Sequence, residues 1–260
     1  MDAELRNKSF LITGASGGIG GAAARLFIAE GARVFAHCHQ NRASIYSLCT
    51  ELGDGCAPVQ ADLRDEARVE AMYDHILRST ECLDGIVVNA GIWPEEAVGL
   101  HEMSLIRWCA TIESDLTSAF LTCRGFMKHL AARPHEAASI VLVSSTAGIF
   151  GEAGHADYAA AKSAMACGLT LSLKNEIVAL APRGRVNCIC PGWTSTPMAA
   201  GGLADEALVR RVLSTMPLKK VATPEDVAAA IVFLSSDALA GHLTGTILPV
   251  AGGMEGRRLD

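Results

Sequence analysis

The residues Ser9–Ile28, SFLITGASGGIGGAAARLFI, decide the fold of this chain. The apolar run Phe10–Ile12 is ended by glycines and predicts a short buried strand, while Ala22–Ala29 places apolar residues at helical spacing. A strand, a glycine-rich turn and a helix in that order form the first unit of a nucleotide-binding fold. In such a unit, the phosphates of the ligand bind free backbone amides at the positive end of the helix.

The glycines of this turn have separate expected roles. Gly14 suits a tight turn, Gly18 lets the backbone approach a pyrophosphate, and Gly20 allows the helix to pack closely. Their spacing is G-x-x-x-G-x-G rather than the commoner G-x-G-x-x-G. A turn that binds no ligand would look similar, but the flanking strand and helix favour nucleotide binding.

The composition indicates a globular protein without a nucleic-acid partner. Half of the 260 residues are hydrophobic, and α/β folds of this length commonly form one domain. The net charge of -6 argues against nucleic acid or an anionic membrane as the main partner. No apolar stretch is long enough to span a bilayer, and charged residues interrupt the N-terminus before a secretory leader develops. Nine irregularly spaced cysteines then suggest reduced thiols in a cytoplasmic protein.

Strand and helix signals alternate along the whole chain. After the first unit, the predicted strands are 32–36, 57–60, 85–89, 139–144, 185–190 and 247–250, and the predicted helices are 44–52, 66–78, 104–130, 158–180 and one beginning at Thr223. This alternation predicts an α/β fold: a single-domain, Rossmann-like, doubly wound parallel sheet with helices on both faces. Nothing divides residues 1–260 into further domains. Residues 193–216 form either a substrate flap or an ordinary surface excursion.

A second motif, Tyr158-Ala-Ala-Ala-Lys162, predicts a proton-transfer pair. Positions four apart lie on one face of a helix, so the phenol and the ammonium are neighbours. A free tyrosine has a pKa of about 10, and a nearby positive charge favours the phenolate and lowers that value. Such a pair can act as general acid or base toward a carbonyl or an alcohol, although the same spacing also occurs by chance on helix surfaces.

Further motifs follow in a familiar order. Ser145 precedes Tyr158 by thirteen positions, Asn89-Ala90-Gly91 follows the fourth predicted strand, and Pro191-Gly192 follows the sixth. Together with Thr13–Gly20, these motifs resemble those of the classical short-chain dehydrogenase/reductase family, especially its 3-oxoacyl-carrier-protein-reductase-like members. The resemblance covers almost the whole chain. It implies an NAD(P)-dependent oxidoreductase that transfers a hydride between a nicotinamide cofactor and a small-molecule carbonyl or alcohol.

The resemblance also implies a role for each matched residue. Tyr158 would be the general acid/base, Ser145 would hydrogen-bond the substrate oxygen, and Lys162 would hold the nicotinamide ribose and lower the tyrosine pKa. The cofactor would contact Gly14, Ser16, Gly17, Gly18, Ile19, Gly20, Asp62, Leu63, Asn89, Ala90, Gly91, Tyr158, Lys162, Pro191, Gly192, Trp193 and Thr196. Small residues along the helix after Tyr158 suit close packing, and the family's habit of assembling through such helices implies a homo-oligomer, a tetramer or a dimer.

Asp115 departs from the family pattern. The family has an asparagine before the leucine at this point, where it supports a helix distortion and a water that connects with the lysine; here the pair is Asp115-Leu116. If Asp115 is ionised, it would stabilise the Lys162 ammonium but partly cancel the field of that ammonium at Tyr158. If it is protonated, it could donate a hydrogen bond as the family's asparagine amide does. A third alternative is that Asp115 only caps the helix irregularity. We treat it as a candidate catalytic residue. The departure motivates an alternative function, a cofactor-binding regulatory or scaffold protein with weak or no turnover, which intact Ser145 opposes.

The end of the second predicted strand bears on the cofactor. An NAD-selective site usually has an acid there to bind the ribose hydroxyls, but this chain has Cys38 and no acid anywhere from 32 to 50. The 2′-phosphate that distinguishes NADP(H) from NAD(H) would meet no repulsion at this position. His39 and Arg42 are the candidate cofactor contacts there, and Arg42 could pair with the phosphate. The basic residue sometimes found in the glycine loop is replaced by Gly17. We predict that NADP(H) is preferred, with NAD(H) as the alternative.

Several other residues give weaker evidence of a functional site. His37-Cys38-His39 could suggest a metal site, but on a strand the two histidines face away from the cysteine, and no further ligand cluster accompanies them. We therefore predict no metal. Cys188 and Cys190 look like small buried residues of a strand. Trp93 either lines the substrate pocket or covers the core.

Overall fold

The computed structural model describes residues 2–254, and these contain one parallel sheet. Its strands are β1 (Ser9–Ile12), β2 (Arg33–Cys38), β3 (Cys56–Gln60), β4 (Gly85–Val88), β5 (Ser139–Val143), β6 (Arg185–Pro191) and β7 (Ile247–Val250). They are ordered β3-β2-β1-β4-β5-β6-β7, so the strand order reverses between β1 and β4. In open parallel sheets, ligands bind at such a reversal, outside the carboxyl ends of the strands.

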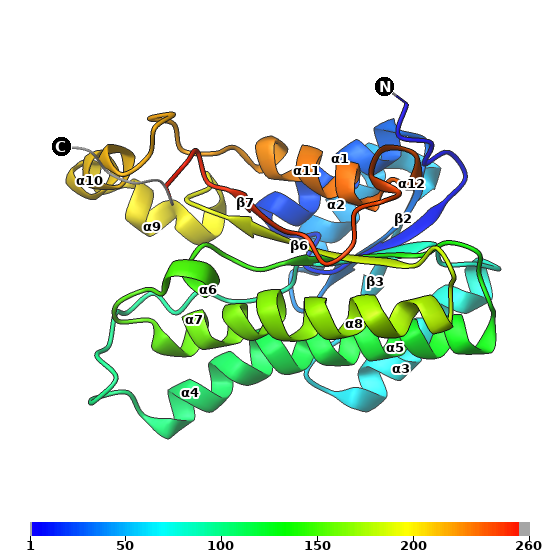
Figure 1. Ribbon diagram of the computed structural model, residues 1–260, viewed down its shortest axis with the longest axis horizontal. Coiled ribbons are helices and arrows are strands. Elements are labelled where there is room, and N and C mark those ends of the chain that lie inside the picture. The colour runs from blue at the N-terminus through cyan, green and yellow to red at the C-terminus, as the bar shows by residue number, and fades with distance from the viewer. Residues whose placement is uncertain (1, 255–260) are drawn as a thin grey trace.

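Helices cover both faces of the sheet (Figure 1). One face carries α1 (Gly18–Ala29), α2 (Arg42–Leu52), α11 (Pro224–Ser235) and α12 (Asp237–Ala240). The opposite face carries α3 (Glu66–Ser79), α4 (Leu105–Ile112), α5 (Ser118–Ala132), α7 (Ala156–Ser163) and α8 (Thr170–Glu176). The short helices α6 (Ala147–Phe150), α9 (Ala200–Leu203) and α10 (Glu206–Ser214) gather at one end of the molecule. The predicted doubly wound α/β fold is confirmed.

Each face of the sheet has its own apolar core. Along β1, Phe10 and Ile12 belong to the core beneath α1 and α11, whereas Leu11 belongs to the core of the opposite face. Phe27 of α1 packs on Phe10 with ring centroids 4.6 Å apart. Because both faces are covered, the strands read as continuous apolar runs rather than alternating ones.

Two long helices each contain a π turn; the family resemblance implied a distortion at the first, but the second was not expected. The segment predicted as a helix over 104–130 consists of α4, a π turn at Glu113–Thr117 and α5. The segment predicted over 158–180 begins earlier, with α7, and passes through a π turn at Ala164–Leu169 into α8. A π turn inserts one residue and redirects the neighbouring side chains, commonly at functional sites. The first of these turns carries Asp115.

The carboxyl end of β2 corrects one prediction. The strand extends to Cys38, through pairing of Cys38 with Gln60 of β3, instead of ending at Ala36. His37 and Cys38 are both buried, because each of the two covered faces receives one of them, whereas His39 lies beyond the strand and is exposed. His39 thus lies outside the strand, so the alternation of strand faces applies only to His37 and Cys38. Cys188 and Cys190 are buried in β6 as expected.

Helix starts follow their capping residues closely. The Thr223 hydroxyl accepts a hydrogen bond from the Asp226 N–H at 3.3 Å, and the Asp226 carboxylate accepts one from the Thr223 N–H at 2.8 Å. This reciprocal box, with Pro224 at the first helical position, begins α11 where the sequence predicts. Shorter 3₁₀ turns occur at Gly53–Gly55, Ile177–Ala179 and Pro197–Ala199.

Three further properties bear on function. Within residues 2–254, no helix combines the length and apolar character that crossing a membrane would require. The same part of the chain contains no group of three or more His, Cys, Asp or Glu side chains placed to hold a metal ion. All nine cysteines are free thiols.

Candidate active site

The glycine loop joins β1 to α1 at the reversal of strand order. Gly14 has a φ of +66°, a conformation that favours glycine, and a Cβ there would lie 2.9 Å from the Ala90 Cα. A Cβ on Gly18 would lie 2.7 Å from the Thr196 side chain, so the loop touches the segment after β6. The first turn of α1 has no side-chain cap, which leaves its amides free for an anion.

Asn89 holds this loop from the neighbouring strand. Its side-chain amide donates to the carbonyl oxygens of Thr13 and Gly14 at 3.0 and 3.3 Å. In return, the Thr13 hydroxyl accepts hydrogen bonds from the N–H groups of Asn89 and Ala90 at 2.9 and 3.1 Å. The turn after β4 and the turn after β1 are thereby fixed against each other.

Just after β3, Asp62 has a partner that the sequence reasoning missed. Arg64 forms a bidentate pair with the Asp62 carboxylate at 2.9 and 2.7 Å, and the His39 ring lies 3.5 Å from the same carboxylate. Hydrogen bonding from Arg64 holds the pKa of Asp62 well below its usual range. Leu63, beside it, is buried. Arg64 stands only two residues after Asp62, but spacing alone does not show that it folds back.

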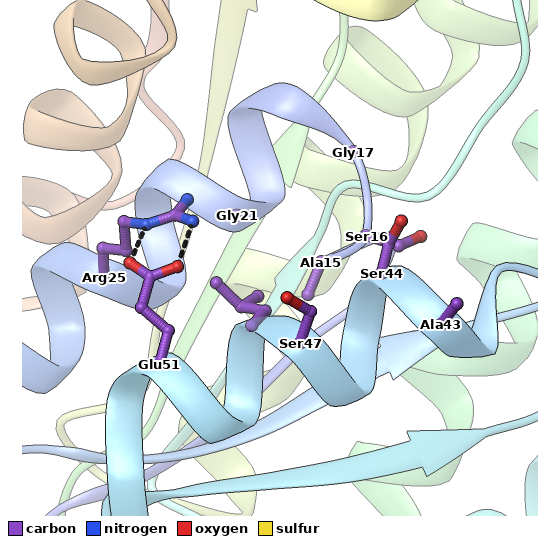
Figure 2. Close-up of a pocket in the computed structure, with 10 residues that line it drawn as sticks. Ala15, Ser16, Gly17, Gly21, Arg25, Ala43, Ser44, Ser47 and Glu51 are labelled. Atoms are coloured by element: carbon purple, nitrogen blue, oxygen red, sulfur yellow. Dashed lines mark hydrogen bonds and ion pairs between the residues drawn. The ribbon is translucent and has the colours of Figure 1, made fainter.

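A cavity of about 430 Å³ opens beside the glycine loop, between α1 and α2 (Figure 2). Ser16 and Gly17 line it from the loop, and Ser44 and Ser47 line it from α2. The far end is closed by Arg25 of α1, which pairs with Glu51 of α2 through two hydrogen bonds of 2.7 Å. Arg42 begins α2 with its guanidinium 5.9 Å from the centre of the Tyr46 ring and is not among the residues lining the cavity.

The three predicted catalytic side chains come from β5 and α7. Ser145 follows β5 and its hydroxyl accepts a hydrogen bond from the Ala147 N–H at 3.2 Å. Tyr158 and Lys162 lie on α7, with the Lys162 ammonium 5.5 Å from the centre of the Tyr158 ring. The Ser144 hydroxyl donates to the Lys162 carbonyl at 2.7 Å and ties α7 to the end of β5. The fold therefore brings these three side chains together.

Asp115 faces Lys162 in the buried interior. Its carboxylate lies 3.4 Å from the Lys162 ammonium and also accepts a hydrogen bond from the Ile92 N–H at 2.8 Å. Asp115 has no exposed surface, and Lys162 is 4% exposed. A Cβ on Gly91 would lie 3.1 Å from the ammonium, so a glycine at this position leaves room for the pair.

Burial and the ion pair together set the protonation of this group. Burial raises the pKa of Asp115 above its ordinary value, although Lys162 lowers it. Burial also pulls the pKa of Lys162 down, but its interactions with Asp115 and Tyr158 more than offset this, so the pKa is above its ordinary value. For Tyr158, burial is the largest effect and keeps the pKa above its ordinary value; Lys162 and the Ser145 hydroxyl lower it, and Asp115 opposes them. The lysine thus remains charged, and Asp115 weakens its effect on the phenol.

Trp93 and His155 add an aromatic group that contacts the tyrosine. The Trp93 ring stacks on the His155 ring at 4.1 Å between centroids and meets the Tyr158 ring edge-on at 4.8 Å. His155 is buried and bonds the Pro94 carbonyl through its Nε2 at 2.9 Å. Trp93 therefore lies against the predicted proton donor, not at a remote part of the core. The sequence reasoning missed His155, which is the residue immediately before α7.

A second missed feature holds the start of α7. Asp157 is fully buried and accepts hydrogen bonds from the Arg107 side chain at 3.0 Å and the Thr111 hydroxyl at 2.8 Å. Arg107 also donates to the carbonyl oxygens of Glu96 and Gly154. Burial would raise the pKa of Asp157, but these hydrogen bonds lower it below its ordinary value. The network joins α4, the loop after β4 and the residue that precedes Tyr158.

Comparison with known proteins decides the family. A family model described as enoyl-(acyl carrier protein) reductase matches residues 14–255. Among characterised relatives, cis-4-hydroxycyclohexanecarboxylate dehydrogenase of Sinomonas cyclohexanicum is 37% identical, over 94% of this chain and 94% of that protein.

The chain belongs to the short-chain dehydrogenase/reductase family.

Other relatives of this dehydrogenase are also named as oxidoreductases. 3beta-hydroxysteroid dehydrogenase 1 of Eggerthella lenta is 36% identical over 96% of this chain and 95% of its own length. A 3-oxoacyl-[acyl-carrier-protein] reductase of Chlamydia pneumoniae is 32% identical over 98% of this chain and 99% of its own length. The chain is thus an oxidoreductase that transfers a hydride between a nicotinamide cofactor and a carbonyl/alcohol pair. The three relatives named here are oxidoreductases and lend no support to the scaffold alternative.

Replacing Asp115 tests its electrostatic effect in this dehydrogenase. Asp115→Asn removes the negative charge 3.4 Å from the Lys162 ammonium, so the pKa of Tyr158 should fall. We expect the pH profile of alcohol oxidation to move to lower pH by roughly 1 unit, with higher turnover near neutral pH. Because a buried ammonium loses its counter-ion, the free energy of unfolding should also fall by about 3 kcal/mol.

Glu113→Gln is the matched control, because it removes the same charge two residues away at an exposed position. Its pH profile should superimpose on that of the wild type. If the profiles of Asp115→Asn and the wild type also superimpose, Asp115 has only a structural role.

Proposed function

We propose that Tyr158 is the general acid/base of this dehydrogenase, with Ser145 and Lys162 as its partners. The observation that carries the proposal is the buried Lys162 ammonium, 5.5 Å from the centre of the Tyr158 ring. A charge in such a buried setting acts more strongly on the phenol than it would in water, because the effective dielectric constant is lower. Ser145 is the other polar group that lowers the pKa of Tyr158.

The residues have distinct roles in proton transfer. When bound, the nicotinamide cofactor supplies or accepts the hydride. During reduction, the carbonyl oxygen of the substrate accepts a hydrogen bond from the Ser145 hydroxyl and takes the proton of the Tyr158 hydroxyl. During oxidation, the Tyr158 phenolate removes the proton of the alcohol. Lys162 stabilises the phenolate in both directions, and Asp115 reduces this stabilisation.

The cofactor groove follows the carboxyl ends of β1, β3, β4 and β6. The free amides of the first turn of α1 would hold the pyrophosphate. Asp62 would lie at the adenine end and Thr196 at the nicotinamide end. Close approach of Thr196 to Gly18 supports this, because it brings the segment after β6 to the glycine loop.

The surroundings of the adenosine ribose support a preference for NADP(H). Cys38 ends β2 where a carboxylate would otherwise repel a 2′-phosphate. The cavity beside the glycine loop presents the hydroxyl groups of Ser16, Ser44 and Ser47 (Figure 2). Arg42 stands at the first position of the same helix, α2, and can swing from the Tyr46 ring toward a phosphate.

Trp93 supplies the proposed wall of the substrate pocket. Its ring lies edge-on against Tyr158, so a substrate whose oxygen reaches the phenol would pass along the indole. Two of the relatives are named for alcohols on saturated rings, a hydroxycyclohexanecarboxylate and a hydroxysteroid. Ring-bearing ketones and alcohols are therefore the first substrates to test, with open-chain 3-oxoacyl thioesters as the comparison.

All nine cysteines are free thiols, which supports the reducing environment of the cytoplasm as the proposed location.

Tyr158→Phe tests the assignment of the general acid/base. The variant loses the transferable proton but keeps the ring, so turnover should fall at least about 100-fold. The dissociation constant for NADPH should stay within about two-fold of the wild type, since the phenol hydroxyl serves proton transfer rather than affinity. Tyr46→Phe, at an exposed tyrosine of α2, is the control and should retain full turnover. Turnover of Tyr158→Phe within a few-fold of wild type would refute the role.

The cofactor preference is tested by calorimetry with NADPH and NADH. Wild type should bind NADPH more tightly, and Arg42→Ala should weaken NADPH about ten-fold, the loss of a charge-assisted hydrogen bond, while NADH binding stays unchanged. Arg68→Ala removes the same charge from an exposed position near the start of α3 and should change neither. Tighter binding of NADH by the wild type, or equal losses for both cofactors in Arg42→Ala, contradicts the preference.

We also propose that the protein forms a homo-oligomer through the helix layer of α4, α5 and α8 (Figure 1). Leu105 and Ile106 of α4 are 74% and 84% exposed, and Phe120 and Leu171 are also exposed. Apolar side chains gathered on one layer mark an association surface. Light scattering should show a dimer or tetramer for the wild type and smaller species for Ile106→Lys. A monomeric wild type would refute the proposal.

A further inference from the structure

The imidazole of His37 connects two separate parts of the proposed cofactor groove. His37 is the fifth residue of β2 and is 1% exposed. Its Nδ1 lies 3.2 Å from the Gly14 nitrogen, and its Nε2 lies 3.0 Å from the Ala61 carbonyl oxygen. Gly14 begins the glycine loop, and Ala61 immediately precedes Asp62. One ring therefore reaches from the pyrophosphate end of the groove to the adenine end.

The two contacts fix the tautomer of the ring. The Gly14 N–H can only donate, so Nδ1 must be the unprotonated nitrogen, whereas the Ala61 carbonyl can only accept, so Nε2 must carry the hydrogen. His37 is thus a neutral imidazole whose two nitrogens are both used. No other arrangement of hydrogens on this ring satisfies both backbone groups.

The Gly14 turn is held from both sides as a result. On one side His37 accepts from the Gly14 N–H through its ring and from the Ala15 N–H through its carbonyl oxygen, the latter at 2.8 Å. On the other side the Asn89 side chain donates to the Gly14 carbonyl at 3.3 Å. The Gly14 backbone has a φ of +66°, a conformation open to glycine, and these contacts hold the turn in it.

The Ala61 end is held in the same way. The Ala61 N–H donates to the Cys38 carbonyl at 3.3 Å, and the Ala61 carbonyl accepts from His37. The last two residues of β2, His37 and Cys38, therefore bind both backbone groups of Ala61. This places Asp62 at a defined position relative to the glycine loop.

We propose that His37 is a positioning residue for the dinucleotide cofactor, which sets the spacing between the glycine loop and Asp62 through its two hydrogen bonds. The inference rests on the proposed cofactor groove. Binding of the whole cofactor needs both ends of the groove at the right separation, so loss of either hydrogen bond lowers affinity without touching the proton-transfer residues.

Protonation of His37 would break the arrangement, because an Nδ1–H would face the Gly14 N–H. Burial lowers the pKa of His37 to about 4; the hydrogen bond to Ala61 raises it, and nearby His39 lowers it. Asp62, itself paired with Arg64, is the acidic group that acts on the ring. The ring therefore stays neutral at physiological pH, and cofactor affinity should decline as the pH falls toward 4.

The experiment compares three substitutions by titration calorimetry with NADPH. His37→Asn can keep an acceptor near Nδ1 for Gly14, His37→Gln can keep a donor near Nε2 for Ala61, and His37→Leu keeps neither. We expect dissociation constants about five-fold higher for Asn and Gln and at least about twenty-fold higher for Leu, in keeping with one and two lost hydrogen bonds. Turnover at saturating NADPH should stay within about two-fold of the wild type in all three.

His129→Asn is the matched control. His129 is also buried, its pKa is likewise lowered to about 4 by burial, and its Nε2 accepts a hydrogen bond from the Leu83 N–H at 3.3 Å. It lies on α5 near the amino end of β4, away from the groove. We expect His129→Asn to lower the free energy of unfolding about as much as the His37 substitutions do, while its affinity for NADPH stays that of the wild type.

Unchanged NADPH affinity in His37→Leu, or an equal loss in His129→Asn, overturns the inference. If His37→Leu does not fold, the Asn and Gln variants decide the question in the same way: wild-type affinity in both overturns it. A wild type that binds neither NADPH nor NADH would instead refute the proposed cofactor groove, so the two failures are distinguishable.

Discussion

The buried ion pair between Lys162 and Asp115 is the interaction on which the rest of the site depends. Removing two charges from water is costly, and at 3.4 Å their attraction offsets that cost only because the interior holds them in place. Asp115 reaches the lysine from a π turn, and Gly91 lacks the side chain that would separate them. The same pair controls the phenol of Tyr158: Lys162 favours its ionisation and Asp115 limits that effect.

The turn after β4 joins this proton-transfer half to the cofactor half. At one end of the turn, Asn89 holds the carbonyl groups of Thr13 and Gly14, which shape the glycine loop. At the other end, Gly91 accommodates the ion pair. A movement of this turn would therefore disturb the cofactor loop and the lysine together. Such coupling suits a reaction in which a hydride and a proton must reach the same carbonyl group from two directions.

Much of this could be predicted from the sequence, because the signals are local. Apolar runs, glycines and the cap at Thr223 mark the strands and helices, and Tyr158 and Lys162 share a face at a spacing of four. Contacts between distant segments gave no such signal: Arg107 with Asp157, or the ring of Trp93 against Tyr158. The π turn at Ala164–Leu169 was missed since one inserted residue barely alters apolar periodicity. The hydrogen bonds of His37 were missed because they join it to Gly14 and Ala61, which are distant in the sequence.

The most direct test measures the ionisation of Tyr158 itself. The chain has three tyrosines; Tyr46 can be replaced by Phe, and burial holds the pKa of Tyr73 well above its ordinary value. Ultraviolet titration of Tyr46→Phe, with and without Asp115→Asn, then follows Tyr158, and Tyr158→Phe in the same background identifies its signal. A midpoint that falls when Asp115 is replaced agrees with control of the phenol by the ion pair; an unchanged midpoint contradicts it.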